Sequence, residues 1–318
     1  MVTGRFAPSP TGDLHLGSAL AALAAWASAR SQRGRFLWRV EDLDGPRVVP
    51  GAADRQIEDA RWLGLDWDGH VVRQSDRGAL YDDALRRLAR AGRLFPCRVS
   101  RSDLKALASA PHGPGLPPYP ASLRPDGLAP GWFDDAVARA DAALRFRVEP
   151  GVVGWDDGVL GPQEQDVAAD VGDVVLRRRD GLTAYQLAVV VDDLAQGVTE
   201  VVRGQDLVGS TGRQIQIVQA LGGAVPAYAH VPLVVAAGEE AAAGDAAPKL
   251  SKRDDALSVR ALRESGVPPE AVVGWLARAL GVGDGSPRTP AEVADAFSTA
   301  RVPPDAVAAP PDLAGRLA

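Results

Sequence analysis

The spacing of hydrophobic and polar residues predicts strands and helices in alternation from the start of the chain. Residues 5–7 are predicted as a short buried strand, and residues 36–40, which are apolar except for Arg39, as a second strand. The alanine-rich segment 14–33 between them is predicted as a helix that ends at Gly34. A strand, a loop and a helix in this order are typical of an α/β sheet with parallel strands.

The same alternation returns in the second half of the chain. Residues 187–191 are all apolar, which predicts a strand buried on both faces inside a parallel sheet. Further strands are expected at 174–176, 198–202 and 232–235. Helices are expected at 52–63, 80–91, 211–221, 258–265, 269–280 and 290–297.

A shift in composition separates the two halves. From Pro96 to about Gly161 the chain is first rich in proline and glycine and then mixed, which is typical of an insertion. We therefore predict an α/β fold with a Rossmann-like core, interrupted by an insertion and followed by a small helical C-terminal region. The expected divisions are 1–95 for the first half of the core, 96–170 for the insertion, 171–235 for the second half, and 236–318 for a loop and the helical region.

Length and composition exclude several classes of protein. At 318 residues the chain is long enough for about two or three domains. The single cysteine, Cys97, cannot form an intrachain disulfide, and the N-terminus has no signal-peptide pattern, so we expect a cytoplasmic protein. The longest apolar stretch, 19–29, is too short to span a bilayer, so no membrane role is expected.

Charge is distributed unevenly along the chain. The net charge of −6 argues against a general nucleic-acid-binding protein. The segment from Arg86 to Lys105, however, holds seven basic residues and one acidic residue, Asp103. Such a stretch can face a phosphate backbone, or it can be a solvated helix face in an arginine-rich chain, and the charge pattern alone leaves both open.

Lysine is used sparingly, and its placement indicates a phosphate site. The 35 basic residues include three lysines, and two of them, Lys249 and Lys252, lie in the run Lys249-Leu250-Ser251-Lys252-Arg253. A lysine ammonium is a compact charge on a mobile stem, which suits a phosphate, whereas arginine presents a planar fork. A basic loop in solvent is the alternative for this run taken alone.

The N-terminal helix begins with a second motif of this kind. Small residues at 9–12 allow a ligand to approach the backbone, and His15-Leu16-Gly17 stands at the helix N-terminus, where N–H groups and the helix dipole favour phosphate. His15 can donate to phosphate oxygens, and Gly17 leaves room for a base or ribose. Alone, His15 could be a simple helix-start histidine, but the two motifs in this order indicate ATP-driven activation of a carboxylate.

Five further stretches carry a resemblance to a known family. They are Arg5 to Gly12, Val40 to Asp42, Leu65 to Asp68, Val189 to Asp193 and Val201 to Gly204. With the two phosphate motifs, they resemble the catalytic core of the glutamyl-tRNA synthetases, which are class I aminoacyl-tRNA synthetases, from Arg5 to about Leu257. The resemblance implies a Rossmann-like core, an insertion of the acceptor-binding type, and the use of ATP with Mg²⁺. It also implies catalytic roles for His15, Gly17, Lys249 and Lys252, of which His15, Gly17 and Lys252 bind ATP.

The resemblance further implies a pocket for L-glutamate. The matching residues are Arg5, Ala7, Ser9, Glu41, Tyr185 and Arg203. Their chemistry agrees with this role, because the arginine forks can bind the side-chain carboxylate, Glu41 can pair with the α-ammonium, and Tyr185 can add a hydroxyl contact.

Local departures point to a shorter branch of the family. Ala21, Ala22 and Leu43 replace residues that are usual in the full-length enzymes, and about sixty residues follow Leu257, which are too few for an anticodon-reading region. The run 46–52 resembles the glutamyl-queuosine tRNA-Asp synthetases. That resemblance implies glutamate activation without tRNA, transfer to queuosine at the wobble position of tRNA-Asp, entry of the anticodon arm into the site, and a monomer.

Other functions stay open at this point. The chain could be a truncated glutamyl-tRNA synthetase that charges a tRNA 3′ end, or a non-catalytic tRNA-binding paralogue that has kept the fold. A further alternative, another nucleotidylyl transferase for a small acid, is disfavoured by the set Arg5, Glu41 and Arg203.

One feature of the family fails in this sequence. Relatives often hold a structural zinc in the insertion with three cysteines and a tyrosine, whereas the matching positions here are Cys97, Val99, Tyr119 and Leu123. One thiolate and one phenol cannot close a zinc site, even with His112 added. We therefore predict no zinc and a buried Cys97. The insertion should instead be held by packing of Leu94, Phe95, Tyr119, Trp132 and Phe133.

Overall fold

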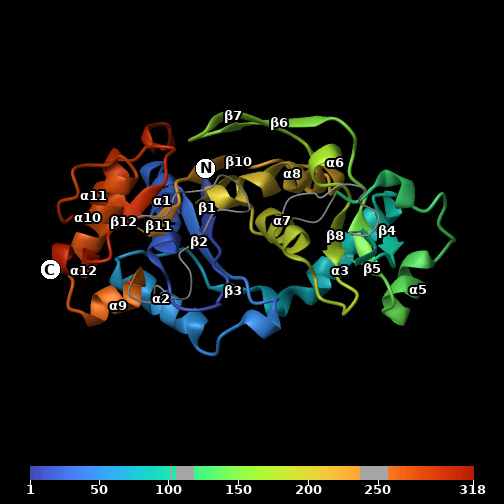
Figure 1. The fold of residues 1–318 in the computed structure, drawn as a ribbon, viewed down its shortest axis with the longest axis horizontal. Helices are drawn as coiled ribbons and strands as arrows, with labels where there is room; N and C mark the ends of the chain where they lie inside the picture. The colour runs from blue at the N-terminus through green and yellow to red at the C-terminus, as the bar shows by residue number, and fades with distance from the viewer. Residues whose placement is uncertain (101, 105–117, 237–256) are drawn as a thin grey trace.

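Parallel strands form the centre of the molecule, as predicted. The structure is a computed structural model that describes residues 1–100, 102–104, 118–236 and 257–318 (Figure 1). One parallel sheet has the order β1 (Thr3–Phe6), β2 (Arg35–Val40) and β3 (Val72–Arg73). The second sheet has the order β7 (Gly161–Asp166), β6 (Val152–Asp157), β10 (Ala227–Val231) and β9 (Glu200–Gly204), with β6, β10 and β9 parallel. The amide of Thr199 donates to the carbonyl of Thr3 at 2.9 Å, so the start of β9 lies beside β1.

The first helix, α1 (Leu16–Ser31), is buried along most of its length. It packs against β1, β9, α10 (Pro269–Ala279) and α11 (Pro290–Ala296), and its many alanines allow these elements to come close. The helix ends before Gly34, as predicted, and the structure gives the physical reason. A Cβ at Gly34 would lie 2.5 Å from the carbonyl oxygen of Val2, so only glycine fits where the chain turns back into β2.

The apolar segment 187–191, predicted as a buried strand, is instead part of a helix, α7 (Tyr185–Ala195). The prediction was wrong because a helix buried on most of its surface shows the same continuous apolar run as a strand inside a parallel sheet. α7 packs against α8 (Thr211–Ala220), α3 (Gly78–Arg90) and β8 (Val174–Arg177). The correction matters for the site, because Tyr185 and the two aspartates that follow the apolar run belong to one rigid element.

The other predicted helices are confirmed within two residues at each end. They are α2 (Ala52–Trp62), α3, α8, α9 (Val259–Glu264), α10 and α11. The strand expected at 232–235 is found only in its second half, as β11 (Val234–Ala236), because residues 232–233 link it to β10, a strand that was not predicted. β11 pairs with β12 (Val307–Ala309), just before the last helix, α12 (Leu313–Leu317). Of the described helices, none is both long enough and apolar enough to cross a membrane.

A separate antiparallel sheet lies at the other end of the molecule (Figure 1). Its order is β4 (Leu94–Cys97), β5 (Ala143–Phe146) and β8, and the short helices α5 (Trp132–Arg139) and α6 (Val167–Asp170) lie nearby. The residues expected to hold this part together are buried or partly buried, but they fall in two clusters. Leu94 and Phe133 join the large cluster around α3 and α7, with Trp132 packed against it, whereas Phe95 and Tyr119 pack with Cys97 and Leu104.

Candidate active site

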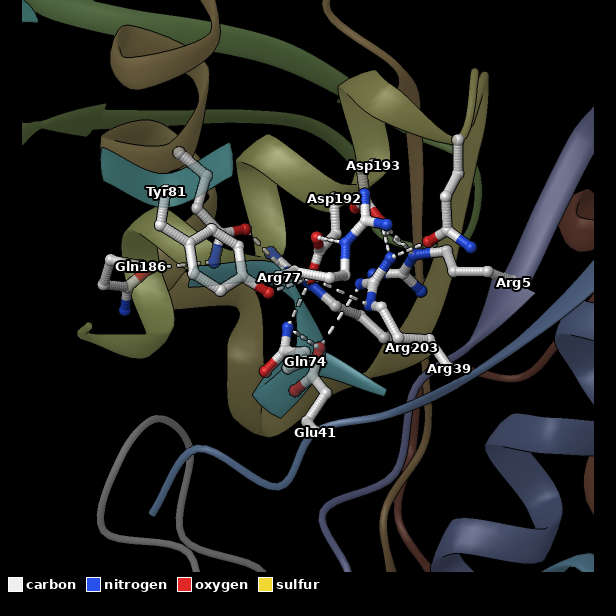
Figure 2. A network of polar contacts seen from close by, with 12 residues as sticks. Arg5, Arg39, Glu41, Gln74, Arg77, Tyr81, Gln186, Asp192, Asp193 and Arg203 are labelled. Atoms are coloured by element: carbon white, nitrogen blue, oxygen red, sulfur yellow. Dashed lines mark hydrogen bonds and ion pairs between the residues drawn. The ribbon is translucent and has the colours of Figure 1, made fainter. Parts of the chain in front are cut away.

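A buried arginine surrounded by carboxylates forms the centre of the site (Figure 2). Arg39 comes from β2, and its side chain is fully buried. Its Nη1 donates to Asp193 Oδ1 at 2.8 Å and its Nη2 to Glu41 Oε1 at 3.3 Å, while Nε lies 3.7 Å from Asp192 Oδ2. Burial opposes the charge of Arg39, but these three carboxylates outweigh it and raise the pKa of the guanidinium.

The helix α7 brings both aspartates into the site, where they share Arg39 but otherwise have different partners. Asp192 is fully buried. It accepts from Arg77 Nε at 2.5 Å, Gln74 Nε2 at 2.8 Å and the hydroxyl of Tyr81 at 2.9 Å. Gln74 also donates to Glu41 Oε1 at 3.5 Å. The carboxylates are therefore fixed from several elements before any ligand arrives.

Arg5, from β1, is the second arginine that contacts Asp193. Its Nε donates to both carboxylate oxygens of Asp193, at 3.2 and 3.3 Å, and its Nη1 to the carbonyl of Val202 at 3.4 Å. Burial disfavours ionised Asp193, but Arg5 and Arg39 together hold the pKa of that carboxyl below its usual range. Arg5 is thus a buried cation whose charge is balanced inside the protein.

Arg203 is buried as well, but its surroundings differ. Its Nε donates to His230 Nε2 at 3.0 Å, its Nη1 to Gln214 Oε1 at 2.7 Å, and its Nη2 to Thr211 Oγ1 at 3.0 Å and the carbonyl of Leu207 at 3.3 Å. The guanidinium also stacks over Tyr228, 5.4 Å from the ring centre. Within the described part of the chain, no carboxylate forms an ion pair with Arg203.

Four of the six residues predicted for glutamate lie within one electrostatic environment. Burial raises the pKa of Glu41, although Arg39 and Arg5 act in the opposite direction. Burial also raises the pKa of the Tyr185 hydroxyl. The nearby charge of Glu41 raises it further, while the charges of Arg203 and Arg5 lower it. The structure therefore brings Arg5, Glu41, Tyr185 and Arg203 together.

The other two predicted residues, Ala7 and Ser9, lie on the loop after β1. The amide of Glu41 donates to the carbonyl of Pro8 at 3.0 Å, which holds this loop beside the end of β2. The side chain of Ser9 is exposed, and Gln56 Nε2 donates to its carbonyl at 3.3 Å. Both residues are thus at the rim of the charged cluster.

The nucleotide motif at the start of α1 adopts the expected helix-start geometry. His15 is the N-cap, and its Nδ1 accepts from the amide of Ser18 at 3.2 Å. A Cβ at Gly17 would lie 3.4 Å from the His15 ring, so glycine keeps this turn open.

Lys249 and Lys252 lie outside the described residues, but described residues on both sides of them in the sequence lie near His15. Val234 of β11 contacts the position above Gly17, 3.8 Å from where a Cβ would be. After the lysine run, Ser258 forms a β-bridge with His15, and the amide of Val259 donates to the carbonyl of Leu14 at 2.7 Å. The described residues that precede and follow the lysine run, Val234 and Ser258, therefore both lie at the His15 turn.

Several residues of the site were missed by the sequence reasoning. They are Arg39, Gln74, Arg77, Tyr81, Asp157, Asp192, Asp193, Gln214 and His230. Arg39 carried one usable signal, because a charged residue inside a strand whose neighbours are all buried demands a buried partner. Asp192 and Asp193 are neighbours on α7, in a stretch that carried the family resemblance but no assigned role. The remaining residues come from other parts of the chain, and no spacing in the sequence connects them with the site.

The four positions considered above for a zinc site do not fit the metal. Cys97 is buried, as predicted, with its Sγ 3.6 Å from the Tyr119 hydroxyl, while Val99 and Leu123 pack as hydrophobic neighbours. Arg145 Nε donates to Cys97 Sγ at 3.3 Å. A guanidinium beside the sulfur, with aliphatic side chains at two ligand positions, is the wrong donor set for zinc. His112 lies outside the described residues.

The basic stretch is partly balanced by acidic residues. Arg93 pairs with Glu149 at 2.5 Å and Arg98 with Asp141 at 2.8 Å. Arg86 and Arg90 are exposed on α3, and Arg101 and Lys105 lie outside the described residues. The positive surface that this part of the described chain presents is therefore smaller than its sequence suggests.

Comparison with known proteins agrees with this geometry. The family described as tRNA synthetases class I (E and Q), catalytic domain, matches residues 1–293. The glutamyl-Q tRNA(Asp) synthetase of Geobacter sulfurreducens is 52% identical over 264 residues, which cover 83% of this chain and 79% of that protein. The protein of the same name from Nitratidesulfovibrio vulgaris is 43% identical over 328 residues, which cover 100% of this chain and 98% of that protein.

A solved structure shares the fold. The crystal structure of a glutamate tRNA ligase from Elizabethkingia meningosepticum in complex with its amino acid has a TM-score of 0.82 and 24% identity, over 99% of this chain and 68% of that one. With a family match over most of its length and relatives this similar along all of it, the chain belongs to the class I tRNA synthetases for glutamate and glutamine and, among these, to the glutamyl-Q tRNA(Asp) synthetases.

Proposed function

We propose that this protein uses ATP with Mg²⁺ to convert L-glutamate to glutamyl-adenylate and then transfers the glutamyl group to queuosine at the wobble position of tRNA-Asp. The observation that carries the proposal is the match over the whole chain to relatives named for that product. The buried cluster of arginines and carboxylates supports it, because an amino acid with an acidic side chain needs both kinds of group. We further propose that the enzyme acts as a monomer in the cytoplasm.

The substrate would be held by two of its three charged groups. Arg203 and Arg5 would bind the side-chain carboxylate, and Glu41 would pair with the α-ammonium, with a hydroxyl contact from Tyr185. Ala7 and Ser9 would line the entrance on the loop beside Glu41. This arrangement leaves the α-carboxylate free to face the nucleotide.

The chemistry then follows in two steps. An α-carboxylate oxygen of glutamate attacks the α-phosphorus of ATP, and the bond to the bridging oxygen breaks to release pyrophosphate. Next, a hydroxyl of the queuosine cyclopentenediol attacks the carbonyl carbon of the adenylate and loses its proton, and AMP leaves. His15 and the N-terminus of α1 would stabilise the phosphates, with Gly17 leaving room for the nucleoside and Lys249 and Lys252 neutralising the developing charge.

Pyrophosphate exchange tests the first step. Among the standard amino acids, glutamate alone should support exchange, and it should do so without tRNA. Aspartate is one methylene too short to reach the arginines, and glutamine would leave a buried guanidinium without its carboxylate. Equal exchange with aspartate or glutamine would refute the pocket.

A labelled transfer reaction tests the second step. Labelled glutamate should appear on tRNA-Asp that carries queuosine, and nuclease digestion should locate the label in the anticodon fragment. Label on the terminal adenosine of a tRNA would favour a truncated synthetase. Binding of tRNA without exchange or transfer would favour a non-catalytic paralogue.

Lys252→Ala tests the nucleotide assignment. Lys252 would act on charge that develops during adenylation. Its removal should therefore raise the activation free energy of that step by about 2–4 kcal/mol and affect glutamate binding much less. Lys252→Arg should restore only part of the rate. A normal adenylation rate in the alanine variant would show that the run is not catalytic.

Metal analysis tests the remaining cofactor prediction. Purified protein should hold no stoichiometric zinc, and chelators should leave its melting temperature unchanged, because Arg145 stands beside the Cys97 thiol. One tightly bound zinc per chain would overturn this.

A further inference from the structure

Three neighbouring strands carry a row of buried polar side chains that includes Arg203. β10 lies between β9 and β6, with His230 directly opposite Arg203 and Tyr228 opposite Asp157 in the strand register. The side chains of His230 and Asp157 are fully buried. Neither residue has a role in the two steps proposed above, so their burial needs another explanation.

The hydrogen bonds of this row have a fixed direction. Asp157 Oδ1 accepts from the amides of His230, Val159 and Leu160, at 3.0 to 3.1 Å, which locks the carboxylate. Its Oδ2 lies 2.5 Å from His230 Nδ1, and His230 Nε2 lies 3.0 Å from Arg203 Nε. A guanidinium can only donate, so Nε2 must accept and the ring proton must be on Nδ1.

The charge state of His230 follows from the same contacts. Burial lowers the pKa of the imidazole, and Arg203 acts in the same direction, while Asp157 and Asp206 oppose them. A doubly protonated ring would turn an N–H toward the N–H of Arg203. The neutral Nδ1–H tautomer is therefore the one that fits, and Asp157 selects it.

We infer that Asp157 and His230 are positioning residues for glutamate recognition, which orient Arg203 through an acceptor that carries no charge. A guanidinium has five N–H groups, and His230, Gln214, Thr211 and Leu207 accept from four of them. These contacts hold the plane of the fork and leave one N–H for the ligand. The inference rests on the proposed function, since the role of Arg203 as a glutamate ligand belongs to that proposal.

Asp157→Asn should reverse the direction of the hydrogen bond between residue 157 and His230 without changing the size of the side chain. The three backbone amides keep the amide oxygen in the place of Oδ1, so the NH₂ group takes the place of Oδ2 and donates to His230 Nδ1. The ring must then carry its proton on Nε2, which faces the N–H of Arg203. The KM for glutamate in pyrophosphate exchange should rise by about tenfold or more, while the KM for ATP stays within about twofold.

Two substitutions of His230 separate positioning from packing. The amide of glutamine can present an acceptor near the place of Nε2, whereas the amide of asparagine reaches only the place of Nδ1 and cannot accept from Arg203. His230→Gln should therefore stay within about threefold of the normal glutamate KM, and His230→Asn should resemble Asp157→Asn. With His230→Gln as background, Asp157→Asn should add little, because no ring tautomer remains to reverse.

Matched controls and melting temperatures make the outcome decisive. His70→Asn and Asp156→Asn change exposed residues of the same types and should leave every parameter unchanged. Equal effects of His230→Gln and His230→Asn on glutamate KM, or a normal glutamate KM in folded Asp157→Asn, would overturn the positioning role while leaving the proposed function intact. If the unaltered protein fails to exchange with glutamate, the proposed function fails and this inference with it.

Discussion

The two arginines predicted to bind the same carboxylate are held in opposite ways. Arg5 donates to a carboxylate, Asp193, which also pairs with Arg39, so the positive charge on that side of the pocket is balanced. Arg203 donates to an imidazole, an amide, a hydroxyl and a carbonyl, all of which are neutral. Both side chains are buried to the same degree, at 4% and 5% exposed, so solvent does not account for the difference.

The comparison shows how a pocket can be rigid and still attract an anion. Neutral acceptors fix the geometry of Arg203, so that no carboxylate among the described residues pairs with it directly, and its charge acts strongly in a buried site. The pair of Arg5 and Asp193 supplies shape and polarity with little net field. We therefore expect Arg203 to provide most of the preference for glutamate over glutamine, and Arg5 mainly to hold the wall of the pocket together.

The largest expected effect is on folding and comes from the balanced side. Asp193→Ala leaves Arg5 and Arg39 without their shared carboxylate, and such a loss from a buried network lowers the free energy of unfolding by about 3–5 kcal/mol. Urea denaturation measures this. Asp312→Ala removes the carboxylate of an exposed pair with Arg316 and should change stability by less than about 1 kcal/mol. Similar losses of unfolding free energy in the two variants would mean that the buried network stabilises the fold no more than an exposed ion pair does.

Arg203→Met should have the next largest effect, on affinity. Loss of a buried charged partner should weaken glutamate binding by about 2–4 kcal/mol, which is roughly 30- to 1000-fold, and glutamine binding much less. Calorimetric titration with both amino acids measures the change in preference. Arg5→Met should weaken both ligands by similar factors. A selective loss of glutamate binding in the Arg5 variant would reverse the assignment of the two arginines.

Gln214→Glu breaks the comparison directly, because it gives Arg203 a carboxylate like that of Arg5. The new side chain has nearly the same shape and can still accept from Nη1, although it can no longer donate to Gln186 Oε1 as Gln214 Nε2 does at 2.9 Å, so the Gln186 amide has to turn over. Glutamate affinity should fall by about tenfold, as the field of Arg203 is compensated, and the melting temperature shows how much stability the lost donor costs. Unchanged affinity would show that the neutral surroundings of Arg203 are incidental.

A pH dependence should sharpen the role of Glu41. Burial raises its pKa above the ordinary carboxyl value of 4.5, so the carboxylate is lost early as pH falls through that raised pKa. The α-ammonium then loses its partner, and glutamate binding should weaken by up to about tenfold for each pH unit below it. Glu41→Gln should bind more weakly at pH 7 and lack this dependence. A slope that survives in the variant would have to come from another group.

The sequence was a good guide to local structure and a poor one to partners. Helix α1 and strand β2 follow from their apolar spacing and from Gly34. The assignment of 187–191 failed because burial on most sides removes the periodicity that separates helix from strand. The residues that match family motifs, such as Arg203, could be named in advance. Gln214 and His230 become its partners only through the packing of α8 and the pairing of β9 with β10, which the sequence pattern does not show.

Arg39 has a consequence for how this protein can change over generations. It contacts three carboxylates, and one of them, Asp193, also contacts Arg5. Replacing any single member leaves a buried charge without its partner, so each single substitution in this set gives a less stable protein. This holds even if replacing the whole set with apolar residues would give a protein that folds well. The cluster should therefore drift very little, and surface positions should absorb most of the divergence between this chain and its descendants.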